Sequence, residues 1–334
     1  MMTTEESPQL LIVSTKVDLA TDYVVLQLEK LGANCFRINS EDFPIAAHAS
    51  FSPIPKPVLH WINSRDQYID LRKVRSVWFR RHRLPEMPAE MDKAHQDYCL
   101  READWFLKGL VYSLALSDRD VRWMNHPERA LSAESKIVQL NVASALGFKV
   151  PETLVSNEPV AIREFYARNR GEVIAKPLRL GYFDFGNRQT CVFTTRITQE
   201  HLNDDDSLRV APVIYQGLIK KSYDIRVTIV GSKLFAAAID SQSIPSAVID
   251  WRRTETAELG HLRHELPSKI ETKCLQLMKR LGLSFGALDL ILTPQGDYLF
   301  LEVNPSGQWV WIEDKLDLPI SRSIAEWLWV PTKK

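Results

Sequence analysis

The sequence is poor in cysteine and has no long apolar run. Its four cysteines, Cys35, Cys99, Cys191 and Cys274, never stand in a Cys-x-x-Cys spacing. Scattered cysteines are typical of a reducing compartment and speak against a structural zinc site. The N-terminus is polar and acidic, and no apolar stretch approaches the ~18 residues that a membrane helix needs. We therefore expect a cytoplasmic protein without a membrane segment.

An excess of one charge is also missing, as are several catalytic and nucleotide-binding motifs. Lys plus Arg and Asp plus Glu both number 42, so no net positive charge favours nucleic acid or an anionic membrane as a partner. There is no His-x-x-x-His pair, no Gly-x-Ser-x-Gly motif and no Walker A motif, so zinc-dependent hydrolysis has no support. No Gly-x-Gly-x-x-Gly follows the first predicted strand, which argues against dinucleotide binding there.

The first third of the chain has the pattern of a parallel α/β unit. A buried strand, a helix closed by glycine and a second strand are predicted in turn by QLLIVST, DYVVLQLEKLG and NCFRINS. Residues 74–85, VRSVWFRRHRLP, predict another strand that ends in an arginine-rich turn. A long amphipathic helix with a period of 3.6 residues follows over 92–116. WMNHPE then breaks this pattern near residue 125.

The rest of the chain mixes helices and strands. Helical patterns cover SAESKIVQLNVASALG and EPVAIREFYARNR, and the strand EVIAKP follows them. After the acidic stretch TQEHLNDDDS the chain becomes rich in strands. Because 334 residues exceed one ordinary core, we expect a mixed α/β fold in three domains, over residues 1–125, 126–208 and 209–334.

The last two predicted strands, GALDLIL and YLFLEVN, form a hairpin across Thr-Pro-Gln-Gly-Asp. A two-residue turn centred on Gln295-Gly296 sets the register. One face then holds only opposed apolar pairs: Leu288 with Val303, Leu290 with Leu301, and Leu292 with Leu299. On the other face Asp289 lies directly across from Glu302, and Asn304 follows Glu302 on the same side.

Two carboxylates opposed across a sheet repel each other and need compensation. Mg²⁺ would supply it, because this ion prefers carboxylate and amide oxygens and needs few protein ligands when substrate phosphates complete its shell. The alternative is a solvated sheet face with incidental charges. The Asn-Pro-Ser-Gly ending favours the metal, since it fixes a turn where a ligand-facing oxygen lies. We therefore predict that Asp289, Glu302 and Asn304 bind Mg²⁺.

An Asp on one strand and Glu-x-Asn on the next resemble the metal site of ATP-grasp ligases. Over roughly residues 125–315 the chain also resembles other parts of that family. Lys136, in SKIVQLNVASALGFKVPETLVSN, and Lys176, in EVIAKPL, resemble its two nucleotide lysines. VIYQGLIKKSYDIRVTIVG resembles its hinge and the strand after it. The resemblance implies an ATP-grasp fold with an N-terminal pre-ATP-grasp domain, and ATP and Mg²⁺ as cofactors.

The same resemblance implies how ATP is held. Lys136 and Lys176 would contact the α- and β-phosphates as point charges. The adenine would lie at the hinge residues Gln216, Gly217 and Leu218. Relatives often carry an acidic residue where this chain has Gly217, but hinge backbone groups usually hold the adenine, so binding remains compatible with glycine.

Two arginines are the predicted catalytic cations. Arg226 lies on the polar face of DIRVTIV, where it can bind a phosphate through two hydrogen bonds. The alternative is a surface cation paired with Asp224 or another neighbour. Arg252, in DWRR, would steady the γ-phosphate or an acyl phosphate, or would have no catalytic role. No general base is identified beyond the candidates Asp240 and Asp250.

Within the ATP-grasp ligases, the chain resembles the microviridin-type peptide maturases, or graspetide synthetases. SVWFRRHRLP, DSQ…VIDWRR and NPSGQWVWIE extend the resemblance over nearly the whole chain. It implies an ADP-forming ligase that activates Asp or Glu side chains of a ribosomal precursor peptide as acyl phosphates. Ring closure would give ω-esters with Ser or Thr, or ω-amides with Lys. The alternatives are a RimK-like ligase joining an amino acid to a protein or small-molecule carboxylate, and a kinase-like protein that phosphorylates without ligating.

The resemblance also implies where the precursor's leader peptide binds. Asp184 and Asn187 lie in LRLGYFDFGNRQTCVFTT, whose glycines and aromatics suit a β-hairpin, and this hairpin and the next helix would hold the leader. Glu200 and Asp204, in TQEHLNDDDS, would pair with basic leader residues. The alternative is a solvated helix that Thr198 caps, with acids in its first turn.

Arg80 and Arg81 follow the predicted strand SVWF. They could attract an acidic core peptide, or they could be interface or surface charges. The family resemblance also suggests a homodimer.

Overall fold

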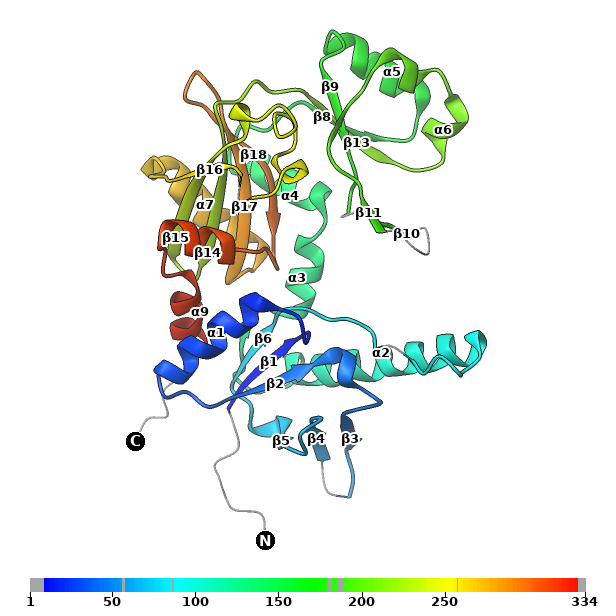
Figure 1. Cartoon of the computed structure of the whole chain (residues 1–334), viewed down its shortest axis with the longest axis vertical. Coiled ribbons are helices and arrows are strands. Elements are labelled where there is room, and N and C mark those ends of the chain that lie inside the picture. The colour runs from blue at the N-terminus through cyan, green and yellow to red at the C-terminus, as the bar shows by residue number, and fades with distance from the viewer. Residues whose placement is uncertain are drawn as a thin grey trace.

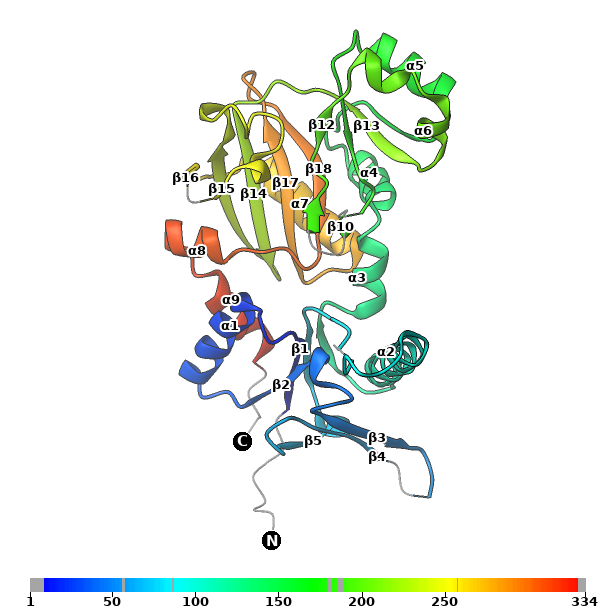
Figure 2. The ribbon, with the colours of Figure 1, turned by 45° about the vertical axis from the view of Figure 1, so that its right-hand side comes forward.

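The computed structural model describes residues 9–55, 58–85, 87–179, 182–184, 189–256 and 258–329. These residues form three α/β bodies, each around one main sheet (Figure 1). We name them the N-terminal, central and C-terminal bodies after the order of their sheets along the chain. The N-terminal body lies at the bottom of Figure 1, and the other two lie beside each other above it, as Figure 2 also shows.

The N-terminal body is built on a four-stranded parallel sheet in the order β2-β1-β6-β7. The strands are β1 (Leu10–Ser14), β2 (Cys35–Asn39), β6 (Ser76–Phe79) and β7 (Arg122–Met124), and the main helices are α1 (Leu19–Lys30) and α2 (Lys93–Ala115). Side chains alternate along β1, so Leu10 and Ile12 pack toward α1 while Leu11 and Val13 pack toward α2. This arrangement confirms the predicted βαβ opening.

A small antiparallel sheet completes this body on the α2 side of the main sheet. It consists of β3 (His48–Ser52), β4 (Val58–Ile62) and β5 (Tyr68–Asp70). Trp61 and Ile69 from this sheet are fully buried in the same apolar core as Leu110 of α2. The small sheet therefore closes the core rather than forming a separate unit.

The central body is an antiparallel sheet in the order β12-β9-β13-β8. Its strands are β8 (Thr153–Ser156), β9 (Val173–Lys176), β12 (Thr195–Arg196) and β13 (Val213–Gly217). The helices α5 (Pro159–Arg168) and α6 (Asp205–Arg209) pack on it through Ile162, Phe165 and Leu208. A hairpin of β10 (Tyr182–Asp184) and β11 (Gln189–Cys191) extends toward the N-terminal body in Figure 1.

The C-terminal body is an antiparallel sheet in the order β16-β15-β14-β17-β18. Its strands are β14 (Tyr223–Val230), β15 (Lys233–Asp240), β16 (Gly260–Arg263), β17 (Phe285–Leu292) and β18 (Tyr298–Asn304). The helices α4 (Lys136–Ala145) and α7 (Ser268–Leu281) bury their apolar sides against it. The chain reaches α4 from α3 (Pro127–Ala133), so this helix precedes the central sheet in sequence but packs on the C-terminal one.

The last described helices return to the N-terminal body. After α8 (Val310–Leu316), helix α9 (Ile320–Leu328) lies against α1 (Figure 1). Ile320, Ile324 and Leu328 share one apolar core with Ile12 and Val24. The two ends of the described chain are thus packed together. No described helix is both long and apolar enough to cross a lipid bilayer.

The β17–β18 hairpin follows the predicted register only at one end. Leu288 pairs with Val303 and Asp289 with Glu302, as predicted. A bulge then shifts the pairing, and Leu290 lies opposite Phe300. The predicted Leu290–Leu301 and Leu292–Leu299 pairs are therefore wrong.

The turn of this hairpin explains the shift. It has three residues, 294–296, closed by hydrogen bonds from Thr293 N to Asp297 O (2.9 Å) and from Gly296 N to Thr293 O (3.0 Å). Gly296 has φ 83°, a left-handed conformation that glycine adopts easily and that typifies this loop. The predicted two-residue turn is thus corrected. The bulge leaves Phe300 in the core, fully buried, and Leu301 on the side of Glu302.

Candidate active site

The predicted metal residues lie together on the open side of the C-terminal sheet. Asp289 on β17 and Glu302 on β18 are direct neighbours across the ladder. The Asn304 Nδ2 donates to Asp289 Oδ2 (3.3 Å) and to Glu302 Oε1 (3.2 Å). The opposite side of both strands is core, with Leu288 and Val303 buried. The alternation of the strands therefore places all three polar side chains on one face, as predicted.

Each carboxylate is paired with one cation from another element. Arg226 Nη1, on β14, lies 3.0 Å from Asp289 Oδ2, and Lys136 Nζ, on the first residue of α4, pairs with Glu302. Burial, helped by the Glu302 charge, raises the pKa of Asp289 to about 6, although Arg226 opposes the shift. Burial would also raise the pKa of Glu302, but Lys136 and Lys176 outweigh it and hold that pKa at about 2.

The arrangement fits a hard divalent cation. The described residues contain no group of three His, Cys, Asp or Glu side chains that could hold a metal, so Asn304 is needed as the third donor. Two carboxylates and an amide oxygen suit Mg²⁺ when phosphates provide further ligands. Asp289 and Glu302 also raise each other's electrostatic cost as neighbouring carboxylates, and a cation between them would reduce that repulsion.

A small cavity of about 60 Å³ next to this cluster lies between the central and C-terminal sheets. Residues of both bodies line it, among them Ile174, Lys176, Gln216, Gly217, Leu218, Ile291 and Leu301. The structure thus brings Lys176 and the predicted hinge residues together at one cavity. Leu301 reaches it because of the bulge described above.

The hinge backbone is already bonded within the protein. Gly217 N donates to Glu152 O (3.0 Å), and Leu218 N donates to Glu172 O (2.9 Å). A Cβ on Gly217 would lie 2.8 Å from Asn169 Oδ1, so glycine permits this close approach. Gln216 is fully buried, and its Oε1 is among the buried side-chain atoms that lack a partner in the described part of the chain.

Lys176 is the cation of the central body at this cavity. Burial lowers its pKa to about 8, and the nearby Lys136 and Arg252 add to this shift while Glu302 opposes it. Lys176 is thus a buried ammonium close to two other cations. Phosphate oxygens would stabilise its charge.

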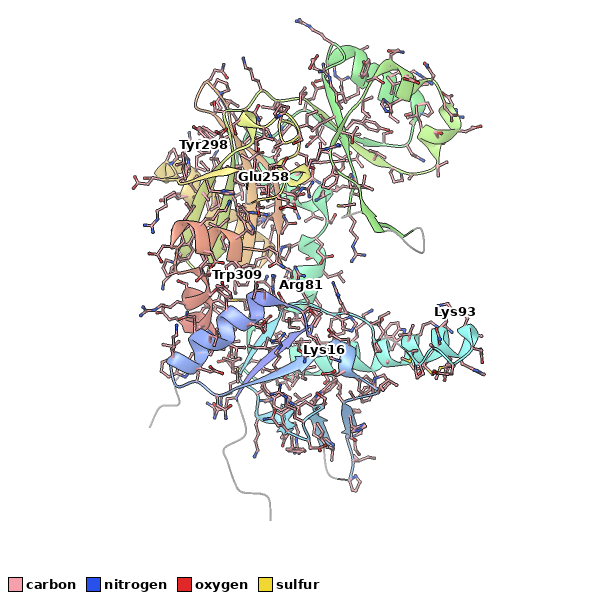
Figure 3. All side chains as sticks on the ribbon, in the orientation of Figure 1. Lys16, Arg81, Lys93, Glu258, Tyr298 and Trp309 are labelled. Atoms are coloured by element: carbon pink, nitrogen blue, oxygen red, sulfur yellow. The ribbon has the colours of Figure 1, made fainter. Side chains whose placement is uncertain are left out.

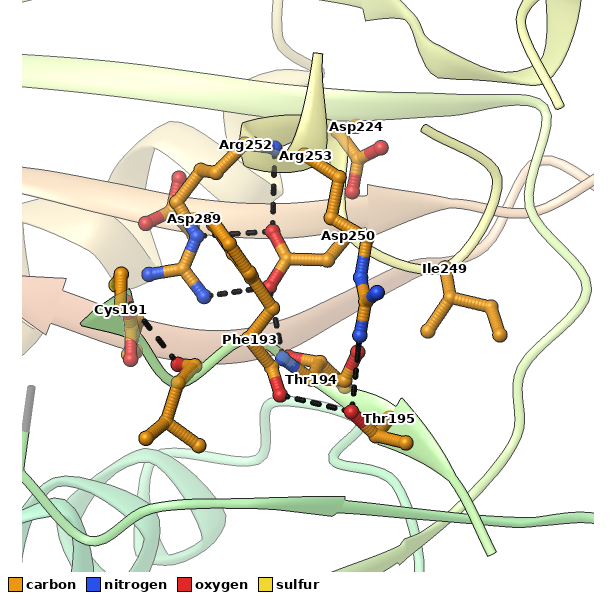
Figure 4. Close-up of polar contacts among 12 residues, drawn as sticks. Cys191, Phe193, Thr194, Thr195, Asp224, Ile249, Asp250, Arg252, Arg253 and Asp289 are labelled. Atoms are coloured by element: carbon orange, nitrogen blue, oxygen red, sulfur yellow. Dashed lines mark hydrogen bonds and ion pairs between the residues drawn. The ribbon is translucent and has the colours of Figure 1, made fainter. Parts of the chain in front are cut away.

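Arg252 is held by a neighbouring carboxylate (Figure 4). Its Nε and Nη2 donate to the two oxygens of Asp250, at 2.9 and 2.7 Å, and Thr194 N donates to the same Asp250 (3.0 Å). These contacts hold the pKa of Asp250 below its usual value although burial opposes the shift, so Asp250 is a poor general base. The other candidate base, Asp240, caps a short helix by accepting from Ser243 N (3.3 Å).

Comparisons with known proteins place this site in a family. The MvdD pre-ATP grasp domain matches residues 9–129. The macrocyclase MdnC of Microcystis aeruginosa MRC, solved with its precursor peptide MdnA, is 32% identical to this chain. The match covers 96% of this chain and 98% of MdnC, with a TM-score of 0.85. The chain belongs to the macrocyclase family of ATP-grasp ligases. The predicted ATP-grasp fold and the N-terminal pre-ATP-grasp domain are confirmed.

The chain is also similar to two further proteins. A RiPP-associated ATP-grasp ligase of Chryseobacterium gregarium, solved with ADP and a leader and core peptide, is 27% identical over 96% of both chains, with a TM-score of 0.88. Human N-acetylaspartylglutamate synthase A is 24% identical over 215 residues, 62% of this chain and 52% of the human protein. The chain spans about half the length of that synthase.

The residues predicted to bind the leader lie in the central body. Glu200 is exposed in a short 3-10 helix (Gln199–Leu202) that Thr198 caps. Asp204 caps α6 and accepts from Asp206 N (3.0 Å) and Ser207 N (3.3 Å). The alternative is therefore correct for Thr198, which caps a helix with Glu200 in its first turn, whereas Asp204 caps the next helix. A role of either acid in peptide binding stays a prediction. Asp184 ends β10, and Asn187 lies outside the described residues.

Arg80 is buried, and its prediction as a peptide contact is corrected. Its Nε lies 3.4 Å from Asp18 Oδ2, and both side chains are almost inaccessible to solvent. The guanidinium is 4.8 Å from the ring of Trp309. Burial lowers its pKa to about 10, and Asp18 opposes the shift. Arg80 is an interface charge, the alternative left open by the sequence. Arg81, labelled in Figure 3, is partly exposed.

The ion pair between Lys221 and Asp224 was not predicted from the sequence. Lys221 pairs with Asp224 (2.9 and 2.7 Å) at the wall of the cavity, and Asp224 also accepts from Ser241 Oγ (2.5 Å). Asp224 therefore bonds Lys221 and not Arg226. The Asp-x-Arg spacing of Asp250 and Arg252 was visible in the sequence, and it signals a local pair of this kind.

Proposed function

We propose that this macrocyclase activates Asp or Glu side chains of a ribosomal precursor peptide as acyl phosphates and closes ω-ester or ω-amide rings. The observation that carries the proposal is the half-buried Asp289, Glu302 and Asn304 cluster beside a cavity lined by Lys176 and the hinge. Relatives that resemble the chain along nearly their whole length act with precursor, leader or core peptides. The enzyme is an ADP-forming ligase, and its cofactors are ATP and Mg²⁺.

The proposed reaction has two steps, phosphoryl transfer to the substrate carboxylate and then acyl transfer to the nucleophile. A substrate carboxylate oxygen bonds the γ-phosphorus of ATP, and the bond from that phosphorus to the bridging oxygen breaks to release ADP. A substrate hydroxyl or amine then attacks the acyl carbon, inorganic phosphate leaves, and the nucleophile loses one proton. The first step is mainly a matter of positioning and charge. The residues on the two walls of the site supply both.

We assign roles to the residues from their places in the site. Asp289, Glu302 and Asn304 would hold Mg²⁺, which when bound neutralises charge on the phosphates. Lys176 would contact the phosphates from the central sheet, and Lys136 from α4. Gln216, Gly217 and Leu218 would line the adenine site.

The roles that we propose for the two arginines follow from the hydrogen bonds that they already make. Arg226 already bonds Asp289 through Nη1, and its Nε is a buried atom that lacks a partner among the described residues, so one side of its fork is available to a phosphate. Arg252 donates hydrogen bonds from Nε and Nη2 to Asp250. Its side chain, 37% exposed, would present its remaining nitrogen to the transferred phosphoryl group.

The substrate contacts and assembly are also proposals. Glu200 and Asp204, with Asp184 and Asn187 of the hairpin segment, would bind a basic leader, and Arg81 an acidic part of the core. We propose the domain limits 1–125, 126–208 and 209–334, and a homodimer. We also propose a cytoplasmic location, because ATP is present there and free thiols persist there, as at Cys35, Cys99, Cys191 and Cys274.

Intact mass spectrometry of a candidate precursor peptide after incubation with enzyme, ATP and Mg²⁺ tests the function. Each ring removes one water, about 18 Da by the stoichiometry of condensation through an activated acyl group, and mild base opens esters but leaves amides. Asp289→Asn should abolish the loss. Asp297→Asn, the same change at the exposed turn of the same hairpin, should retain it. Unchanged peptide with ATP consumed only when free amino acids are supplied would favour the RimK-like alternative.

A further inference from the structure

The loop that follows the metal ligand Asn304 is held by the N-terminal body. Residues 304–307 form a tight turn, with Gly307 N bonded to Asn304 O (3.1 Å) and proline at the second position. Arg80, which follows β6, donates from Nη1 to Ser306 O (2.5 Å) and from Nη2 to Gln308 Oε1 (3.2 Å). A side chain of the first sheet thus holds a backbone carbonyl two residues beyond a metal ligand.

A second side chain from the N-terminal part of the chain holds the neighbouring carbonyl. Asn125, at the junction of β7 and α3, donates from Nδ2 to Pro305 O (3.1 Å) and Phe285 O (2.8 Å). Its Oδ1 accepts from Ser284 N (2.7 Å) and Phe285 N (2.9 Å). Asn125 is almost fully buried. It therefore ties the start of β17, which carries Asp289, to the end of β18, which carries Glu302 and Asn304.

The loop has little room to adopt another position. A Cβ on Gly307 would lie 2.3 Å from the Cβ of Ala287, the residue opposite Asn304 on β17. Trp309, fully buried, packs 6.0 Å from Trp78 between ring centroids. Trp309 is labelled at the boundary between the N-terminal and C-terminal bodies in Figure 3. The loop is thus fixed on one side by β17 and on the other by the N-terminal body.

A buried arginine is a costly way to join two bodies. Removing a cation from water carries a large desolvation cost, and well-packed apolar residues often serve as well or better for stability. Arg80 has its compensation in Asp18, which also accepts from Ser14 Oγ (2.9 Å) and Thr21 Oγ1 (3.0 Å). What an apolar residue could not do is direct hydrogen bonds at Ser306 O and Gln308. The directional contacts point to placement of the loop.

We propose that Arg80 and Asn125 are positioning residues that set the Asn304 ligand, so that the N-terminal body controls the affinity of the active site for its metal. The inference rests on the proposed function of Asp289, Glu302 and Asn304. It adds that two residues distant in sequence, neither of which touches the metal cluster, determine how well the cluster binds a divalent cation. Partners that orient metal ligands typically contribute this kind of effect.

Mn²⁺ binding in the presence of a non-hydrolysable ATP analogue, followed by electron paramagnetic resonance, tests the proposal without turnover. Arg80→Lys keeps the charge but loses the fork, and Asn125→Ala removes the second pair of donors. Each should weaken Mn²⁺ binding about 10–100-fold. In turnover assays the KM for Mg²⁺ should rise by the same factor, while kcat at saturating Mg²⁺ should recover. A merely structural role would not give this split.

Arg119→Lys is the matched control. Arg119 also bonds two backbone carbonyls, Leu71 O (3.4 Å) and Val74 O (2.5 Å), but within the N-terminal body. Its substitution should leave Mn²⁺ binding unchanged. Folding of each variant is checked by cooperative thermal unfolding, and Asn125→Ala decides the question if Arg80→Lys does not fold.

The outcomes separate this inference from the proposed function. Folded Arg80→Lys and Asn125→Ala with the Mn²⁺ affinity of the wild type would overturn the inference and leave the metal site intact. A wild type that binds Mn²⁺ no better than Glu302→Gln would overturn the metal site, and the inference with it.

Discussion

The C-terminal and central sheets border the same cavity, but their polar side chains are bonded differently. On the C-terminal sheet, Asp289 and Glu302 each have a cation and share the Asn304 amide. The strands β14 and β17 have eight residues each. On the central sheet, β9 has four residues, Lys176 has a lowered pKa, and Gln216 Oε1 is among the buried atoms without a partner in the described chain.

This difference suggests that the two sheets contribute to different steps, one to the chemical step and the other to nucleotide binding. Charges that are already paired and backed by a core are preorganised, so they can stabilise developing charge without rearranging. Polar groups whose charge or hydrogen bonds are not fully satisfied gain most from a ligand. We therefore expect changes on the C-terminal sheet to reduce the chemical step, and changes on the central sheet to reduce nucleotide affinity.

The largest effect is expected from Glu302→Gln. It removes one carboxylate of the proposed metal site and leaves Lys136 without its ion partner. Loss of several kcal/mol of charge stabilisation should lower kcat by about 100-fold or more. Single-turnover ring formation at saturating ATP measures it. A reduced ATP affinity with unchanged kcat would reverse the roles assigned to the two sheets.

Gly307→Ala should have the next largest effect. The new methyl group would meet Ala287, and relief of the overlap requires the loop after Asn304 to move. Overpacking of this kind typically costs about 1–3 kcal/mol of unfolding free energy, and the movement should weaken Mn²⁺ binding as well. Denaturant unfolding measures the stability term. Gly109→Ala, at an open position, is the control, and equal effects at both positions would contradict the packing argument.

Lys176 should make nucleotide binding depend on pH. Its pKa is lowered to about 8, so the ammonium that would bind phosphate is present below this pH and is lost above it. Binding of anionic phosphate raises that pKa, so Kd for ATP should rise up to about tenfold per pH unit above 8. Lys176→Arg keeps its charge over this range and should flatten the dependence. The same slope in this variant would assign the titration to another group.

The smallest effect is expected at the proposed leader site. Asp204→Asn keeps a good helix cap but removes the charge. Affinity for a basic leader peptide should fall about two- to fivefold, the range of an exposed ion pair, and less so at high salt. Asp206→Asn, on the same helix and almost fully exposed, is the control. Fluorescence anisotropy of a labelled leader measures both, and equal losses would show a general effect of charge.

The sequence predicted the proximity of Asp289, Glu302 and Asn304 better than the rest of the site because polar and apolar residues alternate there. Asp289, Glu302 and Asn304 are separated by residues that must be buried, so only one register puts them together. Leu299, Phe300 and Leu301 are all apolar. No pattern could show which of them the bulge would skip, and the shift to Phe300 was missed.

Arg80 was misjudged for a different reason. Arginine is rarely fully buried, and its burial here depends on Asp18 and Trp309, which are distant in sequence and meet it only through the tertiary fold. The hinge was placed at the cavity by family resemblance. The bonds from Gly217 N and Leu218 N to Glu152 and Glu172 have no local signal in the sequence.

The return of α9 to the first sheet affects how the chain is completed during synthesis. Ile12, Val24 and Leu28 are made early, yet the core that buries them includes Ile320, Ile324 and Leu328. At about 5–20 residues per second, roughly 15–60 s of translation separate the two groups. During this interval an apolar face of the nascent N-terminal body stays uncovered. A ribosome-bound chain that stops before α9 should therefore be a good chaperone client, and the complete chain should not.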